Sequence, residues 1–149
     1  MHVSTLDLGW CTRAGGCKTD RDFLDFVVDG RPLRQRFEPA GNVGVLGWGL
    51  AEREAIARLL LREPSELPTG RVPLYVCAHC GGVDCGTVAV RIEETADGFV
   101  WSDFTSEVTY YYDSEDERVQ ARFEGVGPFV FGKAEYRDVL GRRLAQVAV

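Results

Sequence analysis

The chain has 149 residues, of which 45% are hydrophobic and 11% aromatic, and this composition is sufficient for one folded domain with a buried core. Its formal net charge of −6 argues against nucleic acid as a partner, because phosphate-backbone binding usually requires a basic face. An acidic surface is better suited to a basic protein partner. We therefore expect a single domain over residues 1–149 that does not bind nucleic acid.

The N-terminus lacks a basic start followed by an apolar stretch, and nowhere do about eighteen apolar residues follow one another. We expect neither a membrane span nor a membrane partner, and we expect a cytoplasmic location. In a reducing cytoplasm the five cysteines are expected to be thiols or metal ligands rather than a disulfide framework. Cys11 and Cys17 are nevertheless close enough in the sequence to pair.

The first part of the chain carries strand and turn signals. Residues 3–10 alternate moderately between apolar and polar side chains, which predicts a first strand. The largely apolar residues 23–28 precede Asp29 and Gly30, and residues 33–37 follow this pair, which is typical of a hairpin turn. We expect a β-hairpin here.

Two segments have apolar residues at helical spacing. Residues 51–62 form the first, in which Ile56 and Leu59 recur on one face. Residues 133–147 form the second, with Tyr136 and Leu140 on one face. These patterns predict two helices.

Further strands are expected between and after these segments. Residues 72–77 and 87–93 are rich in β-branched side chains, residues 99–104 follow an Ala-Asp-Gly turn, and residues 129–131 form a short apolar run. The predicted fold is of the α+β class, an antiparallel sheet made of a hairpin plus a meander and packed with about two helices.

The most distinctive motif is C-x2-C-x4-C, formed by Cys77, Cys80 and Cys85 between two predicted strands. Gly81 and Gly82 permit the tight backbone that lets sulfurs converge, and thiolates are ligands of zinc. A closed structural zinc site needs four ligands, and no second C-x2-C follows. The candidates for the fourth ligand are His79, Asp84, His2, Cys11 and Cys17. The pattern favours reduced thiols without a cofactor, and zinc is the alternative.

Other chemistry is less well supported by the sequence. A redox-active C-x2-C usually opens a helix whose dipole stabilises the thiolate, whereas a strand is predicted after Cys80. A catalytic pairing of a thiol with His79 or His2 lacks an orienting third group. The glycines of residues 41–49 do not have the spacing of a phosphate-binding loop. No motif specifies a reaction, so the sequence favours a protein that is not an enzyme.

Acidic and aromatic residues gather between positions 103 and 117. Tyrosines supply contact area at little entropic cost, and carboxylates steer a basic partner toward the surface that carries them. The alternative is a solvated loop after an edge strand. The predicted partner-binding residues are Asp103, Glu107, Tyr110, Tyr111, Tyr112, Asp113, Glu115, Asp116 and Glu117.

These observations lead to two functional expectations. The first is a small acidic protein-binding module, an immunity or antitoxin-type protein that neutralises a basic toxin in a stoichiometric complex. The second is a zinc-binding or thiol redox protein centred on Cys77, Cys80 and Cys85.

Four segments together resemble a group of small uncharacterised bacterial proteins that share an LYVCxxCGxxxCG strand-turn-strand motif. The segments are LGWG, LYVCAHCGGVDCGTVAVRI, VWSDF and GPFVF with the helix after it, and the likeness spans residues 20–147. The resemblance implies only a loose oxidoreductase label in some members. Those proteins usually have an acidic residue and Gly-Asp-Leu-Gly around the thiols, where this chain has His79 and Gly-Gly-Val-Asp. The difference argues against His79 as an essential ligand.

Overall fold

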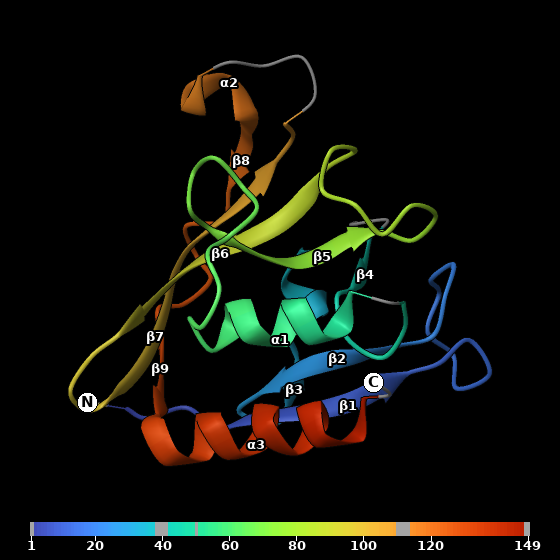
Figure 1. Cartoon of the computed structure of the whole chain (residues 1–149). Coiled ribbons are helices and arrows are strands. Elements are labelled where there is room, and N and C mark those ends of the chain that lie inside the picture. Colours follow the sequence, from blue (N-terminus) through green and yellow to red (C-terminus); the bar gives the residue numbers. More distant parts are fainter. Residues whose placement is uncertain (1, 38–41, 50, 110–113, 148–149) are drawn as a thin grey trace.

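The structure, a computed structural model, describes residues 2–37, 42–49, 51–109 and 114–147. The strands in this part of the chain are β1 (Leu6–Cys11), β2 (Phe23–Val28), β3 (Arg31–Pro32), β4 (Asn42–Gly44), β5 (Val72–Cys77), β6 (Thr87–Glu94), β7 (Gly98–Glu107), β8 (Val119–Arg122) and β9 (Phe129–Gly132). The helices are α1 (Glu52–Leu59), α2 (Glu115–Arg118), α3 (Lys133–Gln146) and the 3-10 helix η1 (Leu33–Phe37) (Figure 1). None of the described helices combines the length and the apolar character that crossing a membrane requires.

The strands form two antiparallel sheets, and the predicted α+β class is confirmed. One sheet has the order β1-β2-β3, and the other has the order β4-β5-β6-β7-β8, with β9 also paired to β7. Single bridges join the sheets at two places, between Leu24 and Leu46 and between Ser4 and Phe131. Because of these bridges, the hairpin and the meander enclose one common core.

The meander β5-β6-β7 lies where the sequence predicts it, but the second strand of the first hairpin is much shorter than expected. Asp29 and Gly30 form its two-residue turn, with φ angles of 51° and 80°. After this turn β3 has only two residues, and residues 33–37 form η1 instead of a strand. Proline has no N–H to donate to a strand ladder, so Pro32 ends the pairing.

Aromatic side chains dominate the core. Trp101 on β7 lies edge-to-face against Phe26 of the other sheet, with ring centroids 5.5 Å apart. Its indole N–H donates to the Tyr136 hydroxyl, which in turn donates to the Leu59 carbonyl. These buried polar groups therefore have partners, and their bonds connect α1, α3 and the large sheet.

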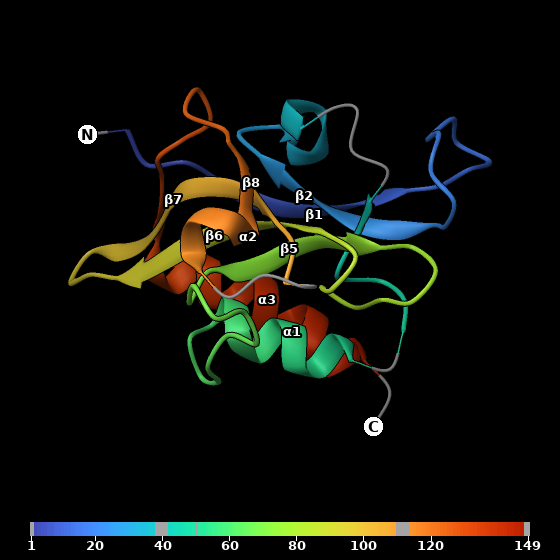
Figure 2. The ribbon, with the colours of Figure 1, turned by 90° about the horizontal axis from the view of Figure 1, so that it is seen from above.

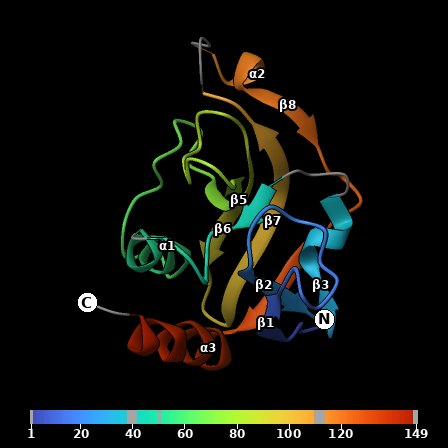
Figure 3. The ribbon, with the colours of Figure 1, turned by 90° about the vertical axis from the view of Figure 1, so that its right-hand side faces the viewer.

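Helices α1 and α3 lie side by side on the same side of the sheets (Figures 2 and 3). Besides the Tyr136 contact, Arg143 of α3 donates to both carboxylate oxygens of Glu52 on α1, at 2.6 and 3.0 Å. Glu52 is buried, so this bidentate pair satisfies a charge that would otherwise be costly to keep there. Both helices predicted from the sequence are confirmed, with α1 shorter than expected.

The five cysteines fall into two groups. Cys11, at the end of β1, forms a disulfide with Cys17 in the following loop, whereas Cys77, Cys80 and Cys85 are free. The expectation of thiols is therefore wrong for the first pair, because the turn after β1 brings the two residues together.

Candidate functional site

The cysteine turn, residues 77–85, joins two strands that run through the interior. β5 is buried over most of its length and ends at Cys77, and β6 starts at Thr87. Within the turn, Val83 is buried and packs in a small apolar cluster with Val76 and Ala89. Burial of Val83 anchors the middle of the turn to the sheet, while Cys80 and Cys85 on either side remain exposed.

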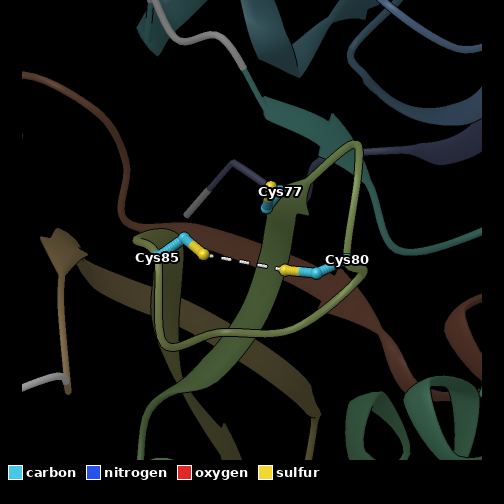
Figure 4. A group of neighbouring side chains, drawn as sticks. All are labelled: Cys77, Cys80 and Cys85. Carbon is cyan, nitrogen blue, oxygen red and sulfur yellow. Dashed lines mark hydrogen bonds between the residues drawn. The ribbon is translucent and has the colours of Figure 1, made fainter.

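The turn brings its three sulfurs together. The Sγ atoms of Cys77, Cys80 and Cys85 all lie within 4.8 Å of one another, and those of Cys80 and Cys85 are 3.7 Å apart (Figure 4). With zinc–sulfur bonds of about 2.3 Å, two sulfurs of a tetrahedral zinc site lie about 3.8 Å apart. The spacing of the Cys80 and Cys85 sulfurs is thus close to that of two ligands of one zinc ion. We call the three cysteines the three-thiol site.

Backbone N–H groups turn toward the sulfurs. The amides of Cys80 and His79 donate to Cys77 and lower the pKa of its thiol. The amide of Gly82 lies 3.4 Å from the Cys80 sulfur. Gly81 has a φ of 70°, a conformation that glycine adopts without strain, and this conformation directs the chain back over the thiols. Donors placed in this way stabilise thiolates, which are the form that binds metals.

The thiols also affect one another. The hydrogen bond and the charge of Cys80, together with the charge of Cys77, raise the pKa of Cys85. Neighbouring thiolates repel, so a third deprotonation is disfavoured in the absence of a cation. A divalent metal among the sulfurs removes this penalty, since its charge favours deprotonated thiols.

The two fourth-ligand candidates within the turn have partners elsewhere. The imidazole of His79 has its Nε2 3.4 Å from an Asp20 oxygen, and its side chain is 82% exposed. The carboxylate of Asp84 accepts a hydrogen bond from the Thr109 hydroxyl. Neither candidate belongs to the group of converging ligand atoms.

The three distant candidates are also engaged away from the turn. The His2 ring lies 3.3 Å from Asp29, and Cys11 and Cys17 are disulfide-bonded to each other. In the described residues none of their ligand atoms lies with the three sulfurs, and a fourth ligand from the chain stays a prediction. Among the residues that the structure describes, the site offers three protein ligands.

The acidic stretch predicted to bind a partner begins inside a network of arginines. Glu107 is completely buried and accepts hydrogen bonds from Arg71, Thr69 and Thr105. Glu107 therefore does not belong to an exposed acidic surface, and the prediction that placed it on a partner-binding surface is corrected. Asp103 is exposed in part, but it accepts two hydrogen bonds from Arg71.

The remaining residues of this stretch are only partly described. Tyr110, Tyr111, Tyr112 and Asp113 lie outside the described residues, and Glu115 and Asp116 belong to the short helix α2. Glu117 is exposed and bonds with Ser114 through both its backbone amide and its carboxylate. Binding of a basic toxin by this stretch stays a prediction.

The chain matches no protein-family model, no curated protein and no solved structure. The resemblance to small bacterial proteins accordingly stays a prediction. The functional proposal below is based on the geometry of the three-thiol site.

Proposed function

We propose that this chain is a zinc-binding protein whose metal is held by the thiolates of Cys77, Cys80 and Cys85. The observation that carries the proposal is the convergence of the three sulfurs within 4.8 Å in a turn whose amides point at them. Ordinary surface thiols need no such arrangement of donors.

The ligand set favours zinc over other common metals. Thiolates select soft or borderline ions such as zinc and copper(I), whereas magnesium and calcium require oxygen ligands. Iron–sulfur clusters are usually held by four cysteines, and the described part of the chain brings three together. Zinc accepts three protein ligands and a fourth, exchangeable one.

The metal is expected to serve a function rather than to hold the fold together. The core of large aromatic residues lies in the two sheets and under the helices, and the three sulfurs lie in a turn at the end of β5, with Cys80 and Cys85 exposed. Exposure of these two ligands gives solvent or a partner access to the zinc ion. The site is therefore suited to zinc exchange or to zinc-dependent chemistry on an incoming ligand.

Metal analysis tests this proposal directly. Protein purified without chelator is expected to contain about one zinc ion per chain, and cobalt(II) added to the metal-free protein is expected to give thiolate charge-transfer absorption. The substitution Cys80→Ser should weaken zinc binding by at least about tenfold. As a matched control, the double variant Cys11→Ala, Cys17→Ala removes two other cysteines and should keep the zinc stoichiometry of the wild type.

Two results would contradict the proposal. One is zinc far below one equivalent in wild-type protein that is folded and has three titratable thiols. The other is equal zinc affinity in wild type and Cys80→Ser, which would place the metal at different ligands.

A further inference from the structure

Two of the three thiols face each other on the surface of the cysteine turn. The sulfurs of Cys80 and Cys85 lie 3.7 Å apart, and the two side chains point toward one another (Figure 4). Both residues are exposed, whereas Cys77 is half-buried at the end of β5. A dissolved oxidant therefore reaches Cys80 and Cys85 more readily than Cys77, because oxidation of thiols follows their exposure.

The backbone of the turn allows these two sulfurs to move closer together. The Gly81 amide donates to the Cys77 carbonyl at 2.9 Å, and the Gly86 amide donates to the Val83 carbonyl at 3.2 Å, so the turn consists of two tight bends. Each bend carries one exposed thiol, and Gly82 joins the bends. Glycine rotates more freely than other residues, and a disulfide requires an S–S distance of about 2.05 Å. Rotation about Gly82 brings the sulfurs to this distance.

The chain closes a loop of similar length at another place. Cys11 and Cys17, six positions apart, are joined by a disulfide, and Cys80 and Cys85 are five positions apart. The free cysteines of the described chain are those of the three-thiol site. A new disulfide within the chain therefore forms inside this site and removes metal ligands from it.

We propose that peroxide joins Cys80 and Cys85 in a reversible disulfide, and that this oxidation releases zinc from the three-thiol site. The release of zinc rests on the proposed zinc-binding function. Formation of the disulfide needs only the two thiols and the oxidant, so it also occurs in metal-free protein.

Hydrogen peroxide supplies the two-electron oxidation that the disulfide requires. One thiolate attacks a peroxide oxygen, the O–O bond breaks, and a sulfenic acid and a hydroxide ion form. The second thiolate attacks the sulfenic sulfur, the S–S bond forms, and a second hydroxide ion leaves. Two protons from the solvent convert the two hydroxide ions into water. A bound zinc ion leaves as Zn²⁺, without a change of oxidation state.

The disulfide removes two of the three ligands that the described chain offers to the metal. Cys77 is then the one remaining thiol of the three-thiol site. Zinc binds thiolates, and the sulfurs of a disulfide are no longer thiolates. We expect the zinc affinity to fall at least about a hundredfold on oxidation and to recover on reduction.

Zinc release and thiol counting test the proposal. Zinc-loaded wild-type protein is treated with a small excess of hydrogen peroxide in the presence of the zinc indicator 4-(2-pyridylazo)resorcinol. We expect release of about one zinc ion per chain and a fall in free thiols from three to one. Dithiothreitol should restore both values. The control variant Cys11→Ala, Cys17→Ala should respond as the wild type does.

Cleavage before Asp84 locates the new bond. A protease specific for aspartate cuts the chain between Cys80 and Cys85, so the two peptides stay joined only if a disulfide bridges the cut. Alkylation before reduction should label Cys77 as the remaining free thiol. In metal-free protein, Cys85→Ser should form an internal disulfide at least about tenfold more slowly than the wild type.

The outcomes separate the oxidation from the metal site. A disulfide from Cys77 to either other thiol, or oxidation that dithiothreitol does not reverse, would overturn the proposal. A disulfide between Cys80 and Cys85 that leaves zinc bound would overturn the release and leave the proposed function intact. Failure of untreated protein to take up zinc would overturn both the proposed function and the release, whereas peptide mapping of metal-free protein would still decide the disulfide.

Discussion

At the scale of single residues, a buried arginine directly before β5 shows how the fold holds a charge in its interior. Arg71 has a side chain that is 2% exposed, and it is held by Asp103 at 2.7 Å and by Glu107 at 3.1 Å. Burial by itself would raise the pKa of Asp103, but the hydrogen bond and charge of Arg71 outweigh it and lower the pKa. Asp103 therefore stabilises the folded protein in its ionised form.

The substitution Asp103→Asn tests this contribution. Asparagine tolerates the φ of 55° at this position as aspartate does, so the change removes charge without adding backbone strain. We expect a loss of about 1–2 kcal/mol in the free energy of unfolding at pH 7, below the cost of breaking a fully buried pair because the Asp103 side chain is 35% exposed. Urea denaturation of the wild type and the variant measures this loss in the free energy of unfolding.

The contribution of Asp103 to stability depends on pH, and the direction follows from its lowered pKa. Because the pKa of Asp103 is lower in the folded state, its contribution is complete above the unfolded value of about 4 and is lost as the pH falls through the folded value. The difference between wild type and Asp103→Asn should shrink in acid. As a control, Asp138→Asn breaks an exposed pair with Arg142 and should cost at most about 0.5 kcal/mol. Equal losses in both variants would argue against a special role for Asp103.

The thiols of the turn should differ in reactivity. Amide donors lower the pKa of Cys77, whereas neighbouring thiolates raise the pKa of Cys85. In metal-free protein we expect alkylation of Cys77 by iodoacetamide to reach half its maximal rate at a lower pH than alkylation of Cys85. Peptide mass spectrometry across a pH series measures both rates, and the reverse order would show that the amides do not control the thiols.

At the scale of elements, close approach of two strands depends on a glycine. A Cβ on Gly98 at the start of β7 would lie 2.0 Å from the Phe131 carbonyl oxygen, where β9 pairs with β7. The substitution Gly98→Ala should separate these strands and cost about 3 kcal/mol or more. Gly141→Ala in α3, where a Cβ meets nothing within 4 Å, should instead stabilise the protein by about 1 kcal/mol. Thermal unfolding of both variants checks the contrast.

The elements show which structural features local sequence can predict. The meander was predicted from its β-branched composition and turn, and helices α1 and α3 from helical spacing, because these signals are contained in the segments themselves. Residues 33–37 have apolar side chains only at Leu33 and Phe37, and Pro32 lacks the N–H that a strand ladder needs, so η1 forms instead of a strand. The short strand β4 has only three residues, too few to show an alternating pattern.

At the scale of the whole molecule, the candidate sites were only partly predictable, because some of their contacts join residues that are far apart in the sequence. Three cysteines in nine residues are a local signal, and their convergence follows from glycines within the same turn. The pairing of Arg71 with Asp103 and Glu107 joins residues 32 and 36 positions apart, and it depends on the sheet order, in which β6 lies between β5 and β7. Carboxylates that the sequence places on an acidic surface are for this reason partners of an internal arginine.

The position of the three cysteines determines how zinc should affect stability. Since the core consists of residues outside the three-thiol site, the metal-free protein is expected to unfold cooperatively from a native state. Zinc that binds only the folded state at one hundred times its dissociation constant should add about 2.7 kcal/mol, or about 5–10 °C in Tm. The shift should vanish in Cys85→Ser and diminish in acid, because thiols must lose protons to bind the metal. Unfolding on chelation alone would show instead that zinc is a structural component of the fold.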